Sequence, residues 1–396
     1  MPGKKKVLII VENLPLPFDR RVWMESNTLT QNGYEVSVIC PKGKGYEKEF
    51  ECIDGINIYR HSLPAEISSA FGYVREYTYA LFHEFRLALK IKKAHGFDII
   101  QLCNPPDVLF LVTLWFKFWY KTKVIFDQHD LNPELFESKF NKRGFFYKAL
   151  IIAEKLTYKT ADLVISTNES YKENAITRGR KDPKDVHVVR SGPNLEKFKP
   201  VAPNLIYKKG KKFLIGYLGV MGEFDGVDYL VKAADYIVNS LSRKEFQFCL
   251  IGSGPCFEDL LSLTKSLNLE EHIEFTGRIS DEDLIERLSS CDLCVNPDPV
   301  NPLNNKSTMN KILEYMALGK AVVQFDVLEG RRSALDASLY AKANDIEDFS
   351  NKIVLLCDSD PSLRNKMGAF GMKRMQEKLE WKYQSQKLLK AYKKIV

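Results

Sequence analysis

The sequence predicts an α/β protein with two domains, each built on a parallel sheet that helices cover on both faces. Strand-like runs alternate with helical patterns, and this alternation occurs twice along the chain. A polar stretch, KPVAPNLIYKKGKK at 199–212, lies between the two halves and is typical of a linker. With 396 residues, 45% hydrophobic and 28% charged, the chain is long enough for two domains of ordinary size.

The expected strands are short apolar runs rich in β-branched residues. In the first half they are KVLIIV (6–11), EVSVIC (35–40), INIYR (56–60), DIIQLC (98–103), KVIFD (123–127), DLVIS (162–166) and DVHVV (185–189). In the second half they are KFLIGYLG (212–219), FQFCLIG (246–252), HIEFTG (272–277), DLCVNP (292–297) and AVVQF (321–325). Such a chain is expected to form two Rossmann-like domains that face each other across a cleft, with ligands at the C-terminal strand ends.

Composition restricts the environment of the protein. No segment reaches about 20 consecutive apolar residues, and the start MPGKKKVLII runs into a strand without a cleavable signal. The eight cysteines lack disulfide or metal spacing, except for CDLC at 291–294, which would be half of a zinc or redox site only beside a second pair. We therefore expect a cytosolic protein with reduced thiols, in which CDLC is a buried strand edge.

The net charge of +7 lies entirely within residues 1–200. There, basic residues alternate with aromatic ones in three stretches, at 70–93, 109–123 and 142–159. Aromatic side chains mixed with Lys and Arg suit the headgroup region of an anionic membrane. The alternative is that these stretches are core helices of an aromatic-rich domain. No recognised nucleic-acid motif accompanies the basic residues, so we expect no nucleic-acid partner.

The segment STMNKILEYMALGKAVVQF at 307–325 joins a helical pattern to a buried strand. Its apolar positions are Met309, Ile312, Leu313, Met316 and Ala317, which share one helical face. Glu314 lies off that face, and Gly319 ends the helix. The helix is expected to begin at Ser307 or Thr308, where its free N–H groups could receive a phosphate.

The run LEYMALGKAVV resembles the signature of family 4 retaining glycosyltransferases of GT-B fold, in which two glutamates eight positions apart hold a nucleotide sugar. The resemblance implies that Glu314 accepts hydrogen bonds from the ribose hydroxyls of the donor. Lys306 stands where the first glutamate of the family would be, and a cation prefers a carboxylate or a phosphate. The alternative is an ordinary amphipathic core helix with one exposed glutamate.

The resemblance implies three parts: an acceptor-binding domain at 1–200, a nucleotide-sugar domain at 201–375, and a helix at 376–396 that crosses back to the first domain. The first loop, VENLPLPFDRRVWMES, has no G-x-G-x-x-G, which argues against a dehydrogenase. It resembles the acceptor loop of a family 4 subgroup that carries FDRRVW. Asp19, Arg20 and Arg21 are therefore expected to line the cleft, where arginines suit a lipid diphosphate or an acidic sugar. The alternative is an exposed turn with Asp19 as a helix N-cap.

His129 and Asp130 follow the strand KVIFD, at the edge where catalytic groups collect. By resemblance His129 contacts the donor sugar near its anomeric carbon, and an imidazole can donate a hydrogen bond there. Asp130 could orient His129, or cap the following turn. Asn104 and Asp107, in CNPPD at the end of the neighbouring strand, are candidate acceptor contacts.

The C-terminal half lacks two cations that the family uses. Its first loop, in GYLGVMGEFDGVDYL, has no arginine at the expected place and has Asp225 in place of the lysine that grips the diphosphate. Gly219 and Gly222 still permit close backbone approach, and Arg190 and Lys306 are the substitute cations. The expected catalytic residues are His129, Asp130 and Arg190. The donor-binding residues are Gly219, Met221, Gly222, Ser253, Gly254, Arg278, Lys306, Thr308, Met309, Asn310 and Glu314.

The resemblance implies transfer of a hexosyl unit, with retention, from a nucleotide sugar to a saccharide or lipid-linked acceptor in cell-surface polysaccharide or glycolipid synthesis. A UDP-sugar is favoured over a GDP-sugar. No D-x-D motif lies in a suitable loop, so we expect neither a metal nor another cofactor. The protein would be cytoplasmic, with peripheral attachment to the inner face of the cell membrane as an option. The alternatives are a sugar-nucleotide epimerase of the same fold and a non-catalytic scaffold that binds sugar nucleotides.

Overall fold

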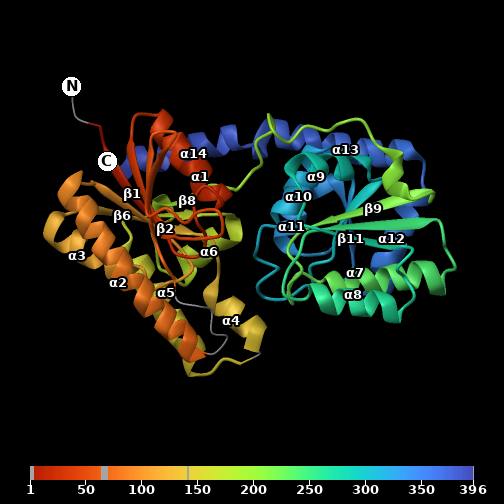
Figure 1. Cartoon of the computed structure of the whole chain (residues 1–396), viewed down its shortest axis with the longest axis horizontal. Helices are drawn as coiled ribbons and strands as arrows, with labels where there is room; N and C mark the ends of the chain where they lie inside the picture. Colours follow the sequence, from red (N-terminus) through yellow and green to blue (C-terminus); the bar gives the residue numbers. More distant parts are fainter. Residues whose placement is uncertain (1–3, 64–69, 141, 396) are drawn as a thin grey trace. The chain divides into compact units, whose positions relative to one another are not determined.

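The computed structural model describes residues 4–63, 70–140 and 142–395 (Figure 1). The chain divides into two compact units. Unit 1 comprises Met1–Ser191 and Gln384–Val396, and unit 2 comprises Gly192–Tyr383. The boundaries expected from the sequence, after residues 200 and 375, lie close to these divisions but not at them.

Unit 1 contains an eight-stranded sheet in the order β3-β4-β2-β1-β5-β6-β7-β8. Its strands are β1 (Lys6–Val11), β2 (Glu35–Pro41), β3 (Phe50–Ile53), β4 (Ile56–His61), β5 (Ile99–Cys103), β6 (Lys123–Gln128), β7 (Leu163–Ser166) and β8 (Val186–Val188). All seven strands that the sequence predicts are present and pair in parallel. The exception is β3, an antiparallel edge strand that the sequence analysis missed.

Helices cover both faces of the unit 1 sheet (Figure 1). On one face lie α2 (Ala70–Ala94), α3 (Phe110–Tyr120) and α5 (Phe145–Thr160), packed on strand residues such as Ile100 and Leu102. Because strand side chains alternate, Gln101 and Cys103 point to the other face. That face carries α1 (Arg20–Gln31) and the later part of α14 (Trp381–Ile395), where Tyr392 bonds Gln101. The remaining helices are α4 (Asn132–Phe140) and α6 (Glu169–Thr177).

Unit 2 contains a six-stranded parallel sheet in the order β11-β10-β9-β12-β13-β14. Its strands are β9 (Phe213–Leu218), β10 (Phe246–Ile251), β11 (Ile273–Gly277), β12 (Leu293–Asn296), β13 (Val322–Phe325) and β14 (Ser338–Ala341). The five predicted strands are all present, and β14 was missed. Cys291 and Cys294 are buried and unpaired, so CDLC is the buried strand edge that the sequence predicts.

Two hydrophobic clusters lie on opposite faces of the unit 2 sheet. Ile215 and Tyr217 belong to the cluster under α7 (Val227–Asp235), α8 (Phe257–Ser266) and α12 (Ile346–Asp358). Leu214 belongs to the cluster under α9 (Asp281–Ser290), α10 (Asn310–Ala317) and α13 (Pro361–Arg374), beside α11 (Leu328–Ala334), and Figure 1 shows both layers. Shorter helical turns are η1 (Pro183–Asp185), η2 (Leu205–Lys208), η3 (Tyr236–Ser240), η4 (Leu335–Ala337) and η5 (Met375–Leu379).

Candidate functional site

His129 follows β6 in unit 1 and is held by a buried carboxylate. Its Nε2 lies 2.6 Å from Oδ2 of Asp127, whose side chain is fully buried. Arg21 clamps the same carboxylate, with its Nε 3.2 Å from Oδ2 and its NH2 group 2.7 Å from Oδ1. The sequence analysis named Asp130 as the residue that could orient His129. The structure gives that position to Asp127, two residues earlier on the strand.

The protonation of His129 follows from its neighbours. Arg21 Nε also lies 3.2 Å from Nε2 of His129, but a guanidinium N–H cannot bond a nitrogen that itself carries a proton. The 2.6 Å contact therefore assigns the Nε2 proton to the bond with Asp127, which leaves Nδ1 for other partners. Burial lowers the pKa of His129, but the charge of Asp127 and its hydrogen bond to the ring together outweigh burial, so the pKa is raised.

The carboxylate of Asp127 is kept ionised. Burial alone would raise its pKa, but the positive charges of Arg21 and His129 outweigh burial and hold the pKa well below its ordinary value. Both carboxylate oxygens are occupied, one by Arg21 and the other by Arg21 and His129. Such a carboxylate can position the imidazole and stabilise its charged form.

A second set of polar residues connects this cluster to the C-terminal helix. Gln101 donates from Nε2 to Glu25 at 2.6 Å and to Asp127 at 3.3 Å, while its Oε1 accepts from the hydroxyl of Tyr392. Burial raises the pKa of Glu25 to about 8, despite the nearby Arg21. The sequence analysis missed Glu25, Gln101, Asp127 and Tyr392. The available signal was Gln101, a polar residue inside the apolar strand DIIQLC.

Arg21 lies inside the cluster. Besides Asp127, it contacts Glu25 at 3.0 Å, the Val189 carbonyl at 2.9 Å and Ser191 Oγ at 3.0 Å. These partners occupy its guanidinium. The sequence analysis expected Arg21 to contact the acceptor, whereas the structure shows that it positions the carboxylate of Asp127. Asp19 is the buried N-cap of α1 and accepts from the Val22 N–H at 3.0 Å. Arg20 is exposed.

Asn104 and Asp107 are also buried, and their side chains hold neighbouring groups in place. Asn104 Oδ1 accepts from the backbone N–H of His129 at 2.7 Å, and its Nδ2 donates to Asp107 at 2.9 Å. Burial, together with the charge of Glu154, raises the pKa of Asp107 to about 7. Asp130 is half-buried, and no described residue donates a hydrogen bond to its carboxylate, so it does not cap the next helix.

Arg190 lies just beyond β8, and it is buried. Its backbone N–H donates to Gln384 of α14 at 3.2 Å, and the carbonyl of the preceding residue, Val189, accepts from Arg21. The structure thus places Arg190 next to the segment that holds Arg21. Its expected catalytic role stays a prediction.

One group of potential metal ligands occurs in the described part of the chain. Ligand atoms of Cys103, Asp127 and His129 lie within 4.8 Å of one another. The guanidinium of Arg21 already supplies the positive charge at this place. Burial and the charge of Asp127 raise the pKa of the Cys103 thiol well above its ordinary value, which disfavours the thiolate that a metal needs. These residues do not fit a metal ion.

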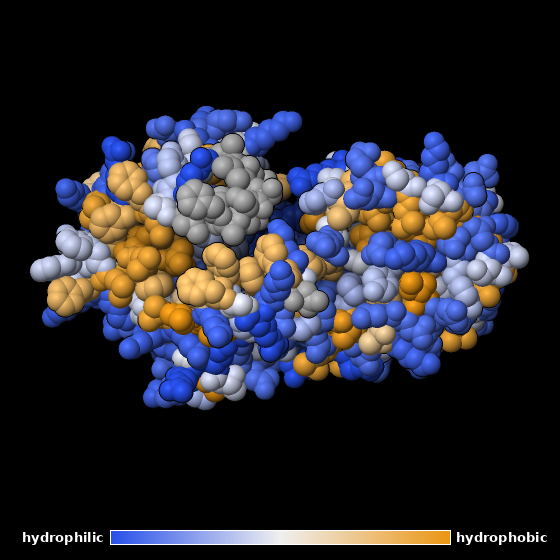
Figure 2. All heavy atoms as spheres, turned by 90° about the horizontal axis from the view of Figure 1, so that it is seen from below, coloured by the Kyte–Doolittle hydropathy of each residue, from blue (hydrophilic) through white to orange (hydrophobic). Residues whose placement is uncertain are grey.

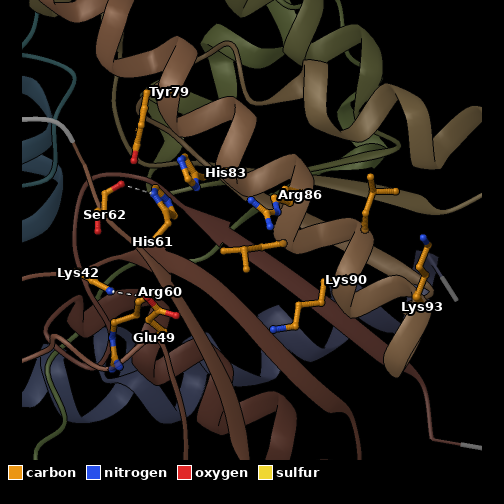
Figure 3. Close-up of a pocket in the computed structure, with 12 residues that line it drawn as sticks. Lys42, Glu49, Arg60, His61, Ser62, Tyr79, His83, Arg86, Lys90 and Lys93 are labelled. Carbon is orange, nitrogen blue, oxygen red and sulfur yellow. Dashed lines mark hydrogen bonds and ion pairs between the residues drawn. The ribbon is translucent and has the colours of Figure 1, made fainter.

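A cavity of about 680 Å³ lies elsewhere in unit 1, between the end of β4 and helix α2 (Figure 3). Its lining includes Lys42, His61, Arg86, Lys90 and Lys93. Lys42 pairs with Glu49 at 3.1 Å, whereas no described residue pairs with Arg86, Lys90 or Lys93. Burial lowers the pKa of His61 to about 4, so its ring is neutral near pH 7. The cavity therefore offers unneutralised positive charge that the sequence analysis did not single out.

In unit 2, α10 buries the side chains that the sequence predicts. Ile312, Leu313, Met316 and Ala317 are buried, and Glu314 is the one partly exposed residue of the run 311–318. The helix begins at Asn310, not at Ser307 or Thr308, and its N-cap, Met309, offers no capping side chain. Ser307 instead bonds the Leu303 carbonyl within a turn that includes Lys306. Lys306 and Thr308 are half-buried.

Two loops at the β9 and β10 ends approach each other backbone to backbone. A Cβ on Gly252 would lie 1.9 Å from the Gly219 carbonyl oxygen, and one on Gly254 would lie 2.5 Å from that of Met221. The backbone N–H of Met221 donates to the Ser253 carbonyl at 3.2 Å. These glycines therefore serve loop packing. Arg278, just after β11, is exposed.

Asp225, which stands in place of the family lysine, is half-buried beside a buried ion pair. Its Oδ2 accepts from the backbone N–H of Gly222 at 3.1 Å, and Oδ1 lies 4.0 Å from Nζ of Lys311. Lys311 pairs more closely with Asp298, at 2.9 Å, and lies over the ring of Tyr217. The sequence analysis missed Lys311, although a lysine next to the apolar face of α10 was a signal. Burial lowers the pKa of Lys311, but Asp298, Tyr217 and Asp225 together outweigh burial, so the pKa is raised.

Comparison with known proteins identifies the family. Residues 19–197 match the family model described as Glycosyltransferase Family 4, and residues 212–359 match the one described as Glycosyl transferases group 1. A chitobiosyldiphosphodolichol beta-mannosyltransferase of Debaryomyces hansenii is 25% identical over 329 residues, 74% of this chain and 67% of that protein. A Campylobacter jejuni N,N'-diacetylbacillosaminyl-diphospho-undecaprenol alpha-1,3-N-acetylgalactosaminyltransferase is 28% identical over 217 residues, covering 52% and 54%.

Solved structures share the fold. A sucrose-phosphate synthase from Thermosynechococcus elongatus matches with a TM-score of 0.80 at 18% identity, covering 99% of each chain. An Anabaena protein in complex with UDP-glucose matches with a TM-score of 0.73 at 14% identity, covering 98% of this chain and 99% of the other. These matches agree with two parallel-sheet α/β units of GT-B type. The chain belongs to glycosyltransferase family 4, and it is a glycosyltransferase of GT-B fold.

Proposed function

We propose that this glycosyltransferase moves a hexosyl unit, with retention of configuration, from a nucleotide sugar to a saccharide or lipid-linked acceptor in cell-surface polysaccharide or glycolipid synthesis. The observation that carries the proposal is the fixed imidazole of His129. Asp127 holds Nε2 and raises the pKa, so Nδ1 can donate a hydrogen bond to a sugar hydroxyl or stabilise developing charge. The donor we favour is a UDP-sugar.

Retention by front-side displacement fits the cluster better than a covalent double displacement. A double displacement needs a carboxylate with an oxygen available to attack the anomeric carbon. Both oxygens of Asp127 are engaged by Arg21 and His129, and Glu25 is held mostly neutral near pH 7 by its raised pKa. Departure of the donor phosphate would then be assisted by hydrogen bonds and fixed charge.

On the donor side, Glu314 is proposed to accept hydrogen bonds from the ribose hydroxyls. It is the carboxylate that α10 leaves partly exposed while burying its neighbours. Lys306 is proposed to contact the donor diphosphate or an acidic sugar, because Lys311 is committed to Asp298. No metal is required by this proposal, since a helix dipole, backbone N–H groups and a cation can meet the phosphate charge.

The acceptor is proposed to be a saccharide carried on a lipid or a free saccharide. Two relatives are named for acceptors on diphosphodolichol and diphospho-undecaprenol, which supports a lipid-linked class. Of the two arginines expected at the acceptor, Arg20 is the exposed one, and we propose it as the acceptor contact. A lipid-linked acceptor would bring the protein to the cytoplasmic face of a membrane.

The test is a transfer assay with UDP- and GDP-sugars in the presence of a lipid extract or an oligosaccharide acceptor. We expect transfer with retention, read from the product by NMR, and a large loss of turnover in His129→Ala with smaller effects on donor binding. His95→Ala, at an exposed histidine outside the cluster, is the matched control. Conversion of the sugar nucleotide without any acceptor would instead indicate an epimerase.

A further inference from the structure

Helix α3 presents an apolar surface to solvent. Its exposed residues are Leu111, Leu114, Trp115, Phe118, Trp119 and Tyr120. Phe118 is 77% exposed and Trp119 62%. The one charged residue of the helix, Lys117, is directed toward the end of α5, where Nζ donates to the Thr160 carbonyl at 2.6 Å and to Asp162 at 2.7 Å. The outer side of α3 therefore carries no charge.

Neighbouring helices extend this surface. Phe82 of α2 is 63% exposed and Phe145 of α5 is 79% exposed. The ring of Phe85, on α2, contacts Trp115 with centroids 6.2 Å apart, so α2 and α3 are adjacent. Figure 2 shows hydrophobic residues gathered at the left of the view, over the part of unit 1 that holds α3. We use the term α3 face for the exposed large apolar residues of α2, α3 and α5. They are Tyr79, Phe82, Leu111, Leu114, Trp115, Phe118, Trp119, Tyr120, Phe145, Phe146, Ile152 and Leu156.

A surface of this composition is unfavourable in water and marks a contact with an apolar phase or partner. Within the described ranges, none of the helices is long and apolar enough to cross a membrane. Helix α3 has 11 residues, about half of what a bilayer crossing needs. A short helix with an apolar outer side can instead lie in the plane of the membrane interface, where Trp and Tyr are favoured.

Cations border the α3 face. On α2 the exposed residues Arg75, Arg86, Lys90 and Lys93 follow the same helical stripe as Tyr79 and Phe82, and three of them line the cavity of Figure 3. Lys121 and Lys123 follow α3, and Lys148, Lys155 and Lys159 are exposed on α5. The net positive charge of the chain lies within residues 1–200. This pattern is complementary to anionic lipid headgroups, whereas a neutral protein partner would leave the cations unmatched.

We propose that the α3 face is a membrane-docking surface for a bilayer that contains anionic phospholipid. Trp115, Phe118 and Trp119 enter the interfacial region, and the cations of α2 and α5 bind lipid phosphates around them. The proposal goes beyond the transfer reaction, because it concerns where unit 1 binds and requires no acceptor.

The first test is sedimentation of the full chain with vesicles, with or without acidic phospholipid. We expect binding that needs acidic lipid and weakens as salt rises. Phe118→Glu/Trp119→Glu should weaken binding about tenfold or more, because two large apolar side chains no longer leave water. Leu205→Glu/Ile206→Glu is the matched control, since these residues of η2 are 70% and 71% exposed and the change of charge is identical.

A second pair of variants separates charge from apolar insertion. Lys90→Gln/Lys93→Gln should reduce the dependence on acidic lipid, whereas Lys265→Gln/Lys366→Gln, at exposed lysines of unit 2, should not. Insertion itself is read from tryptophan fluorescence, because Trp115 and Trp119 are two of the four tryptophans. Vesicles with brominated acyl chains should quench the wild type, and Trp115→Phe/Trp119→Phe should lose most of that quenching while still binding.

Several results would overturn the proposal. One is wild-type binding that the α3 substitutions leave unchanged while their thermal unfolding midpoint matches the control. Another is a stable dimer that Phe118→Glu/Trp119→Glu dissociates in the absence of vesicle binding, which would make the face an interface between two copies. Transfer to a soluble acceptor is measured separately, so a failure of docking and a failure of the proposed reaction give different results.

Discussion

Unit 1 and unit 2 both place polar groups at the C-terminal ends of parallel strands, but they hold them differently. In unit 1 the side chains of Arg21 and His129 both bond the buried carboxylate of Asp127. In unit 2 the strand-end loops pack through glycine backbone, and Lys311 pairs there with Asp298 and, at longer range, with Asp225. The contrast shows that unit 1 fixes the orientation of an imidazole with buried charged side chains, whereas unit 2 shapes its strand-end loops through close backbone packing.

The largest effect is expected for Asp127→Asn. Removing the carboxylate charge leaves Arg21 buried beside Glu25 alone, whose raised pKa keeps it mostly neutral near pH 7. Such a change costs about 3 to 5 kcal/mol of unfolding free energy. Turnover should fall as well, because His129 loses the group that fixes its ring. Denaturant unfolding and transfer assays measure the two effects. Asp130→Asn is the control, and equal stabilities of the two variants would remove the contrast between the units.

The pH dependence of stability tests the same network through Glu25. Its pKa is about 8 in the folded protein and about 4.5 without burial, so the folded state binds the proton more tightly. The stabilisation from this group is present below pH 4.5 and is lost as the pH rises toward 8, with a slope of about 1.4 kcal/mol per pH unit. Unfolding of Glu25→Gln should therefore depend less on pH between 5 and 8. Glu173→Gln, at an exposed residue of α6, should keep the wild-type slope, and a common slope for all three proteins would contradict the interpretation.

Unit 2 is expected to respond in affinity and not in stability. Glu314→Ala should weaken nucleotide binding by about 1.5 to 3 kcal/mol, the usual size of a hydrogen bond to a charged group, with unfolding near normal. Isothermal calorimetry with UDP and GDP measures this, with Glu347→Ala on α12 as a control on the same unit. Wild-type affinity in Glu314→Ala would exclude this glutamate from the donor site.

The smallest effect is expected for Tyr392→Phe. Its hydroxyl donates to Gln101, which in turn bonds Glu25 and Asp127, so loss of the hydroxyl should cost about 1 kcal/mol and lower turnover modestly. Tyr34→Phe is the matched control, because the Tyr34 ring packs against Tyr392 with centroids 5.6 Å apart. If both variants lose the same turnover, ring packing and not the hydrogen bond supports the cluster.

The sequence predicted the elements better than the charged contacts. Alternating apolar runs located twelve strands. The two that were missed, β3 with the partly exposed sequence FECI and β14 with the sequence SLYA and two half-buried residues, do not carry a strong apolar signal. The Asp54-Gly55 turn before β4 was the available sign of the β3 hairpin. Ser307 looked like a helix cap because nothing local shows that it bonds Leu303 in a preceding turn.

The direction of charged side chains was the part that sequence could not supply. The FDRRVW resemblance placed Arg21 at the acceptor, yet Arg21 lies in the first turn of α1 and its side chain bonds Asp127. That partner is more than a hundred residues away in the chain, so no local pattern reveals it. His129 was identified by resemblance. The residue that holds it, Asp127, has no feature in the sequence that distinguishes it from any polar residue near the end of a strand. The position of Lys311 beside the apolar face of α10 was a signal of burial, but its pairing with Asp298, in the loop after β12, is visible only in the structure.

The discontinuous make-up of unit 1 has a consequence for synthesis on the ribosome. Residues 1–191 emerge first, but the hydroxyl that bonds Gln101 belongs to Tyr392, on the far side of the whole of unit 2 in the chain. Domains generally fold as they emerge, so unit 2 can fold while unit 1 still lacks its C-terminal segment. The polar network around His129 is therefore completed late, and a nascent chain that carries only the first segment holds His129 and Asp127 without the helix that supports them.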